Sequence, residues 1–172
     1  MTGWIWLASC AETRDPTGAE RHLALTADDL LPVAIKRVDL DKRDERWQVR
    51  RTGEGWSLEY DYQHESLSVT FRATRAPSAS AAEAGWNSSA MSASFVDAMG
   101  GVELEPIAAP SWGDATECSS VAVTDLDVGF VCRGLSGPRM FSVTVYGVSP
   151  HGDGAPSRLL GPTLHALDAW EP

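Results

Sequence analysis

The 172-residue chain has little cysteine, no long apolar run and few positive charges in its second half. No apolar stretch approaches the ~18 residues that a membrane-spanning helix needs. Seven of the 14 basic residues fall between Lys36 and Arg51, where acidic residues are interleaved with them, and the net charge is −10. Nucleic-acid binding needs an uncompensated basic surface, so the charge pattern argues against that class of function.

The sequence also lacks the short motifs that carry catalysis or cofactor binding. It contains no HExxH, CxxC, GxSxG, GxGxxG or Walker sequence, and we expect no cofactor. Two acid–base candidates remain: His64 with Glu65 at a turn between strands, and His151 with Asp153 in the loop SPHGDGAP. The segments DLDKRDE and TDLDVG offer carboxylate oxygens to calcium but lack the other positions of a calcium loop.

The first of three cysteines suggests an export signal. Cys10 ends the segment Leu7-Ala8-Ser9-Cys10, the pattern of a lipobox, after which a bacterial lipoprotein is cut so that the cysteine carries the lipid. The apolar run before it is short and has no basic residue, so export would require a start codon upstream of Met1. The alternative is a chance match. We expect residues 1–21 to be the remnant of an export signal and a flexible tether, because AETRDPTGAER is polar and without periodicity.

Lipidation of Cys10 would leave Cys118 and Cys132 as an even pair. Each lies in a separate strand-like run with a turn between them, which predicts a disulfide worth about 3 kcal/mol; two buried free thiols are the alternative. Disulfides persist outside the cytosol. The cysteines therefore predict an extracytoplasmic protein that contacts the membrane only through a lipid on Cys10, with a cytoplasmic location as the alternative.

Alternation of apolar and polar residues predicts most of the strands. In WSLEYDY, the residues Trp56, Leu58, Tyr60 and Tyr62 alternate with polar ones, and RWQVRRT and LSVTFRA flank this run to give a three-stranded meander. A second group follows in VELEPI, ATECSSVAVT, VGFVCRG and MFSVTVYGV. VAIKRVDL is rich in β-branched residues and predicts a further short strand.

Two segments have helical character. The Ala-rich segment before Gly100-Gly101 predicts a helix over about 81–99, with Ser80 and Glu83 as a capping box and Met91, Phe95 and Met99 as its core-facing stripe. GPTLHALDAW predicts a short helix with Leu164 and Leu167 facing inward. The element order predicts an α+β fold: an antiparallel sheet of six to eight strands with one long and one short helix packed on it, as a single domain over residues 22–172.

This layout resembles the Mog1/PsbP-like fold and, more narrowly, small actinobacterial lipoproteins and sensor-like extracellular domains. The segments that carry the resemblance are Leu7-Ala8-Ser9-Cys10, LTADDLLP, GWSLEYDY, the Ala-rich helix ending at Gly100-Gly101, and the cysteine-bearing strands. The resemblance implies a binding or assembly module without a common catalytic constellation, and it transfers no site residue.

We therefore expect a non-catalytic, envelope-associated module that binds a partner protein or an apolar small molecule on the sheet face or rim that the helices leave uncovered. Trp112 in APSWGD is the candidate contact, because exposed aromatic residues anchor interfaces; the alternative is that it fills the sheet edge. Two other hypotheses remain: an enzyme that uses one of the histidine–carboxylate pairs, and a cytosolic immunity-like or adaptor protein whose acidity matches a basic partner.

Overall fold

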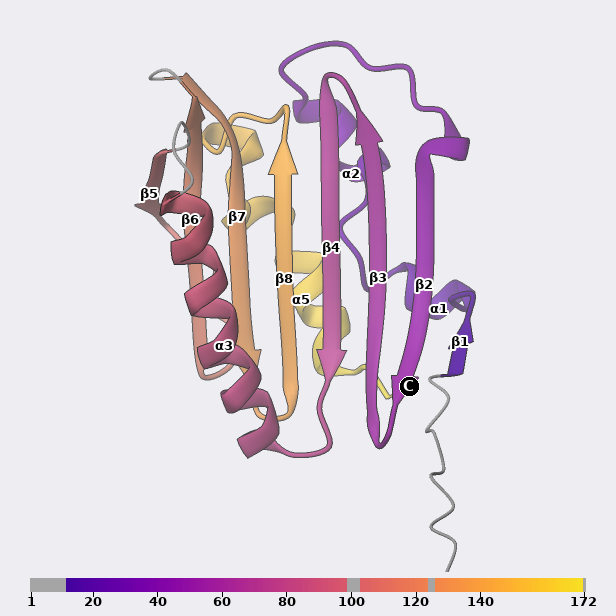
Figure 1. The fold of residues 1–172 in the computed structure, drawn as a ribbon. Coiled ribbons are helices and arrows are strands. Elements are labelled where there is room, and N and C mark those ends of the chain that lie inside the picture. The colour runs from indigo at the N-terminus through magenta and orange to yellow at the C-terminus, as the bar shows by residue number, and fades with distance from the viewer. Residues whose placement is uncertain (1–11, 99–102, 124–125, 172) are drawn as a thin grey trace, which may run out of the picture.

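The computed structural model describes residues 12–98, 103–123 and 126–171. In these ranges eight strands form one antiparallel sheet in the order β1-β2-β3-β4-β8-β7-β6-β5 (Figure 1). The strands are β1 (Glu12–Arg14), β2 (Glu45–Thr52), β3 (Gly55–His64), β4 (Leu67–Arg75), β5 (Glu103–Ile107), β6 (Ala115–Val123), β7 (Leu126–Ser136) and β8 (Arg139–Tyr146). The predicted antiparallel sheet and α+β class are confirmed.

Two groups of hairpin-connected strands meet in the middle of the sheet. The alternating segments form β2–β3–β4 and β6–β7–β8 as predicted, and Gly53 and Gly137 supply the positive φ that their tight turns require. The groups join where β4 pairs with β8, in a register that runs from Ser68↔Tyr146 to Arg75↔Arg139. This join is not local in sequence, and it places Tyr146 beside Ser68 and Arg139 beside Arg75.

Helices lie on both faces of the sheet. They are α1 (Gly18–Arg21), α2 (Ala27–Leu30), α3 (Ala79–Ala98), α4 (Pro156–Leu159) and α5 (Gly161–Asp168), with 3₁₀ turns η1 (Leu31–Val33), η2 (Lys42–Asp44) and η3 (Gly152–Gly154). In Figure 1, α3 crosses in front of β6, β7 and the lower part of β8, while α2 and α5 lie behind the sheet. We call these the front and back faces.

The main core lies between the back face and the helices behind it. Alternate residues of the central strands point into this core, including Leu58, Phe71 and Val143, which are at most 1% exposed. The short C-terminal helix packs on it as predicted, because Leu164 and Leu167 are buried. Since side chains alternate along a strand, the residues between these buried ones face the front.

The segment expected to be a flexible tether is in part folded, so that prediction is wrong for residues 12–21. β1 pairs with β2 through Glu12↔Arg51 to Arg14↔Val49, and α1 follows directly. Thr17 and Glu20 cap α1 reciprocally: the Thr17 hydroxyl accepts from the Glu20 N–H, and the Glu20 carboxylate accepts from the Thr17 N–H. Residues 1–11, including Cys10, lie outside the described residues.

Two other local predictions differ from the structure. VAIKRVDL forms the end of η1 and one isolated bridge, Ala34↔Val148, instead of a strand. The long helix begins at Ala79, and Ser78 rather than Ser80 is the capping residue, since its hydroxyl accepts from the Ala81 N–H at 3.2 Å. The stripe Met91, Phe95 and Met99 lies outside the residues whose side chains are described.

No helix in the described part of the chain is long and apolar enough to span a membrane.

Candidate functional site

The predicted disulfide is present. Cys118 on β6 and Cys132 on β7 stand directly opposite each other in the ladder, and their sulfur atoms are bonded. Both residues are buried in the main core, at 5% and 4% exposure. A bridge between two neighbouring strands closes a loop of 14 residues, so it acts as a local staple.

Trp112 is buried, so the prediction of an exposed contact there is wrong; the ring packs on the inner strands β7 and β8 instead of filling the sheet edge. Its indole is 7% exposed, its ring meets the Phe141 ring edge-on at 5.3 Å, and its Nε1 donates to the Asp168 carboxylate at 2.8 Å. Gly134 leaves the space for this ring, because a Cβ there would lie 2.8 Å from the indole. Trp112 therefore attaches the loop before β6 to α5.

The two histidine–carboxylate pairs lie on exposed turns. His64 ends β3, and its Nδ1 accepts from the Ser66 N–H at 3.3 Å, so the imidazole caps the β3–β4 turn. His151 and Asp153 are exposed in the loop after β8, where Asp153 forms an ion pair with Arg158. Neither pair lines the surface depression described below.

Of the two acidic segments considered for calcium, DLDKRDE has its Asp41 carboxylate paired with an arginine. The Asp41 carboxylate accepts from the backbone and side chain of Arg43, which lowers the pKa of Asp41 to about 2. Asp125, in the second segment, lies outside the described residues. Within the described ranges no group of three or more histidine, cysteine or acidic residues is placed to hold a metal ion.

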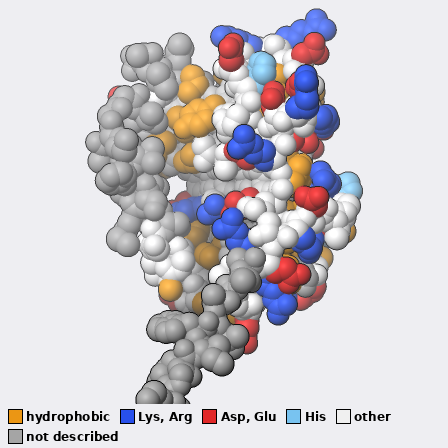
Figure 2. Space-filling view, turned by 45° about the vertical axis from the view of Figure 1, so that its right-hand side comes forward, with side chains coloured by type: hydrophobic (Ala, Val, Ile, Leu, Met, Phe, Trp, Pro, Cys, Tyr) orange, Lys and Arg blue, Asp and Glu red, His pale blue; other side chains and the backbone are white. Residues whose placement is uncertain are grey.

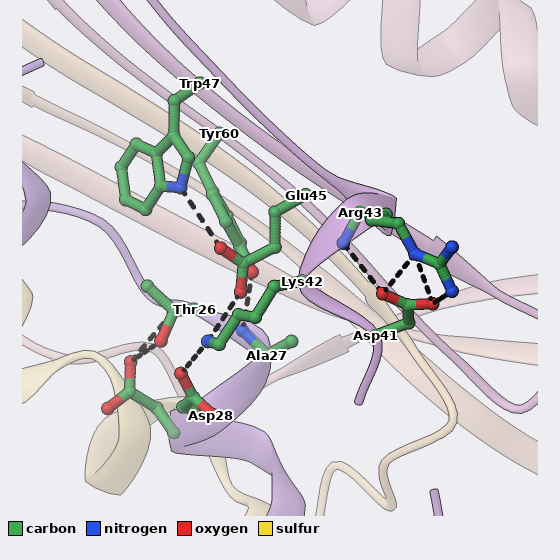
Figure 3. A network of polar contacts seen from close by, with 10 residues as sticks. Thr26, Ala27, Asp28, Asp41, Lys42, Arg43, Glu45, Trp47 and Tyr60 are labelled. Atoms are coloured by element: carbon green, nitrogen blue, oxygen red, sulfur yellow. Dashed lines mark hydrogen bonds and ion pairs between the residues drawn. The ribbon is translucent and has the colours of Figure 1, made fainter. Parts of the chain in front are cut away.

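A polar network fastens the N-terminal segment to the start of β2 (Figure 3). Lys42 bridges Asp28 at 2.5 Å and Glu45 at 2.9 Å, and both carboxylates raise the pKa of its ammonium group. Behind it the Tyr60 hydroxyl accepts from the Ala27 N–H at 3.0 Å, at the first turn of α2. Burial raises the pKa of Tyr60, so this phenol stays protonated and serves the fold.

The strongest candidate surface is the part of the front face that α3 does not cover. We call it the open face: the outward side chains of β2, β3, β4 and β8 away from α3 (Figure 1). It comprises Arg46, Gln48, Arg50, Ser57, Glu59, Asp61, Gln63, Ser68, Thr70, Arg72, Ser142, Thr144 and Tyr146. These are mostly charged, amide and hydroxyl side chains.

Side-chain contacts between strands hold the open face in one arrangement. The Asp61 carboxylate accepts from the Thr70 hydroxyl at 2.7 Å and from the Gln63 amide at 2.9 Å. Arg72 pairs with Glu59 at 3.1 Å across the β3–β4 ladder. Figure 2, seen from the β2 side, shows basic and acidic side chains intermixed over the described surface. The open face is therefore preorganised and is not a field of one sign.

Tyr146 supplies an exposed aromatic ring at one end of the open face. It is 37% exposed and is in register with Ser68 of β4 and Gly129 of β7. Ile35, 53% exposed, lies at the same end, because its N–H donates to the carbonyl of Gly147, the next residue after Tyr146. Sequence analysis missed Tyr146, although the inward pattern of Phe141, Val143 and Val145 places the following residue outward.

A shallow depression lies beside the start of α3. Its volume is about 410 Å³, and it is wide open to solvent. Its lining is Ala79, Glu83, Trp86, Asn87, Asp114, Ala115, Leu135 and Gly137. Sites for small apolar ligands are enclosed and mostly apolar, so this mixed, open depression does not favour such a ligand.

Comparisons of the chain with family models, with curated proteins and with solved structures find no match.

Proposed function

We propose that this protein is a non-catalytic binding module of the cell envelope that docks a partner protein on the open face, with Tyr146 as the aromatic anchor. The single observation that carries the proposal is that helix α3 covers only one side of the front face. Helix α3 packs over β6 to β8, while no described element covers the ordered polar surface on the strands beside it, where Tyr146 is exposed. Aromatic anchors surrounded by polar residues are typical of transient protein interfaces.

The location rests on the disulfide. A bond between Cys118 and Cys132 persists in an oxidising compartment, which favours a place outside the cytoplasm. Processing at Cys10, and with it a lipid anchor, belongs to the same proposal, as does the Mog1/PsbP-like layout. A soluble domain attached by its N-terminus would leave the open face accessible to other envelope proteins.

The charges and the exposed aromatic ring of the open face indicate which groups a partner protein would carry. Positive charge gathers at β2, where Arg46 and Arg50 are exposed, whereas the carboxylates of Glu59 and Asp61 are already engaged within the face. Tyr146 lies three strand spacings away on β8, about 14 Å. A matching partner carries an acidic group opposite β2 and an apolar pocket opposite Tyr146.

Site-specific photo-crosslinking in the host cell tests the docking surface. A photo-reactive amino acid replaces Thr144, beside Tyr146, and in a separate variant replaces His165, which is exposed on α5 behind the sheet. We expect one discrete adduct from position 144 that disappears with Tyr146→Ala, since losing an aromatic anchor costs about 2 kcal/mol or roughly thirtyfold in affinity. Equal adducts from both positions, or an adduct indifferent to Tyr146→Ala, would contradict the proposal.

Thiol labelling tests the location independently. Both cysteines are buried, so protein taken from the host under acid quench is first unfolded in urea at pH 8; Cys118 and Cys132 should then resist iodoacetamide until a reductant is added. Labelling of both residues without reductant would place the protein in a reducing compartment and would remove the envelope part of the proposal.

A further inference from the structure

Three arginines and one tryptophan stand in a single row on the back face, at the end of the sheet far from Tyr146. The register pairs are Arg51↔Trp56, Trp56↔Arg75 and Arg75↔Arg139, so the row crosses β2, β3, β4 and β8. We call these four residues the arginine row. It concentrates positive charge in a chain whose net charge is −10.

The row is electrostatically unfavourable without an anion. Arg75 and Arg139 are directly opposite on neighbouring strands, and like charges in that position repel. The guanidinium of Arg51 lies 5.4 Å from the centre of the Trp56 ring, which does not neutralise it. A nearby arginine outside the row, Arg14, is by contrast fully paired with the Glu20 carboxylate through two hydrogen bonds of 2.7 and 2.6 Å.

One carboxylate of the protein itself bridges the central pair. Glu171 Oε2 lies 2.8 Å from Arg75 Nη1, and its Oε1 lies 3.1 Å from Arg139 Nη2. The Glu171 side chain is 65% exposed, whereas those of Arg75 and Arg139 are 34% and 20% exposed. After α5 the chain runs behind the lower ends of the strands toward β3 and β2, where the C mark lies (Figure 1). Arg75 and Arg139 are thus mostly buried side chains of central strands, whereas the carboxylate between them belongs to Glu171, an exposed residue after α5.

Arg139 has a donor that this carboxylate does not satisfy. Arg139 Nε and Trp170 Nε1 are both buried, and neither has a hydrogen-bond partner within the described part of the chain. The two residues are in contact, since Arg139 Nη2 donates to the Trp170 carbonyl at 3.5 Å. Buried donors without acceptors are costly, and Arg139 keeps one, Nε, that Glu171 leaves unused.

We propose that the arginine row is a binding site for carboxylate ligands and that Glu171 occupies it in their absence. An incoming carboxylate takes the place of Glu171 between Arg75 and Arg139, with one oxygen on each guanidinium. The neighbouring Arg51, which lies over the Trp56 ring, accommodates the rest of the ligand. The ligand is either a free organic acid or an acidic side chain of an extended peptide. The site is on the face opposite to the proposed docking surface and does not depend on it.

Titration of the full chain with glutarate tests this inference. The ¹H–¹⁵N signal of the Trp56 indole, assigned with Trp56→Phe, reports binding in the row. We expect glutarate to shift this signal and to bind Glu171→Gln about fivefold tighter than the unchanged protein, because the competing carboxylate is gone. Arg75→Gln should bind about tenfold more weakly. The matched control Arg43→Gln makes the same change of charge at an exposed site before β2, at the other end of that strand from Arg51, and should stay within about twofold.

Further probes separate the two ligand sources. An acetylated, amidated peptide with two glutamates that binds more tightly than glutarate assigns the site to an acidic peptide, and equal or weaker binding assigns it to a free acid. Tighter binding of inorganic phosphate than of either would overturn the carboxylate assignment. An unshifted Trp56 signal, equal affinity in Glu171→Gln, or equal losses in Arg75→Gln and Arg43→Gln would overturn the site itself. Glu171 is exposed near the chain end, so its variant keeps the test valid if Arg75→Gln does not fold.

Discussion

The two outer parts of the sheet are held by different kinds of bond. On the β1–β3 side, charged and aromatic contacts fasten the N-terminal segment: Arg14 pairs with Glu20, and Arg21 lies 4.9 Å from the ring centre of Trp47. On the β5–β7 side, a covalent bridge joins Cys118 to Cys132. The first part therefore responds to pH and the second to reductant, so the stability of each part can be changed separately.

Loss of the disulfide should have the largest effect. A bridge across 14 residues contributes about 3 kcal/mol in the chain-entropy account, and both cysteines are also buried. We expect the double change Cys118→Ala and Cys132→Ala to lower the free energy of unfolding in urea by about that amount. Dithiothreitol should destabilise the unchanged protein to the same level and leave the double variant unaffected. A reductant that has no effect on the unchanged protein would contradict this prediction.

The ion pair between Arg14 and the buried Glu20, on the β1–β3 side, should have the next largest effect. Glu20 is 6% exposed, and its bonds to Arg14 and Thr17 lower its pKa from 4.5 to about 2. Glu20→Gln should cost about 2 kcal/mol at pH 7, because it leaves Arg14 without its charge partner. The folded-state pKa lies below the unfolded one, so the contribution is complete above about pH 4.5 and is lost as the pH falls toward 2.

Denaturant unfolding at several pH values checks this prediction. The difference between Glu20→Gln and the unchanged protein should be constant from pH 7 to 5 and should shrink below that. The double cysteine variant provides the control, since its deficit should not follow this pH profile. A Glu20→Gln deficit that persists at pH 2.5 would show that packing, and not charge, holds α1.

On the side that carries the disulfide, the hydrogen bond from Trp112 to Asp168 should make an intermediate contribution to stability. Trp112 Nε1 donates to Asp168 at 2.8 Å and joins the loop before β6 to α5. Trp112→Phe keeps most of the buried ring and removes this donor, so we expect a loss of about 1 kcal/mol in thermal or urea unfolding. In an Asp168→Ala background the same change should cost less, which a double-mutant cycle measures. Full additivity of the two changes would mean that the hydrogen bond contributes nothing.

Sequence patterns predicted what is local and missed what depends on register between distant strands. The alternation of buried and exposed residues around Leu58 in β3, and around Val143 in β8, can be recognised within each strand by itself. It therefore predicted the strands of both meanders. The pairing of Arg75 with Arg139 depends on the β4–β8 join across 64 residues, which no local pattern specifies. The arginine row was therefore invisible in the sequence, although each of its strands was predicted.

Other misses had a usable signal. The sequence Thr17-x-x-Glu20 is a capping box of the kind sought at Ser80, and here the reciprocal bonds form. The polarity of its surroundings suggested a tether instead, because one turn of helix and a three-residue strand are too short to show a period. Burial of Trp112 depends on the space left by Gly134 in a different strand, so the loop sequence around Trp112 could not reveal it.

The smallest effect is expected for an exposed ion pair on the β1–β3 side, which can be compared with the buried carboxylate of Glu20 on the same side. Lys42 and Asp28 form a short ion pair, but their side chains are 64% and 57% exposed. Water and salt screen such a pair, so Asp28→Asn should cost at most about 0.5 kcal/mol in 50 mM salt and nothing measurable in 1 M salt. Glu20→Gln should keep most of its deficit in 1 M salt, because its carboxylate is buried against Arg14. Urea unfolding of both variants at the two salt concentrations measures the contrast. If Asp28→Asn proved as costly as Glu20→Gln, the exposed network of Figure 3 would fasten the N-terminal segment as firmly as the buried pair does.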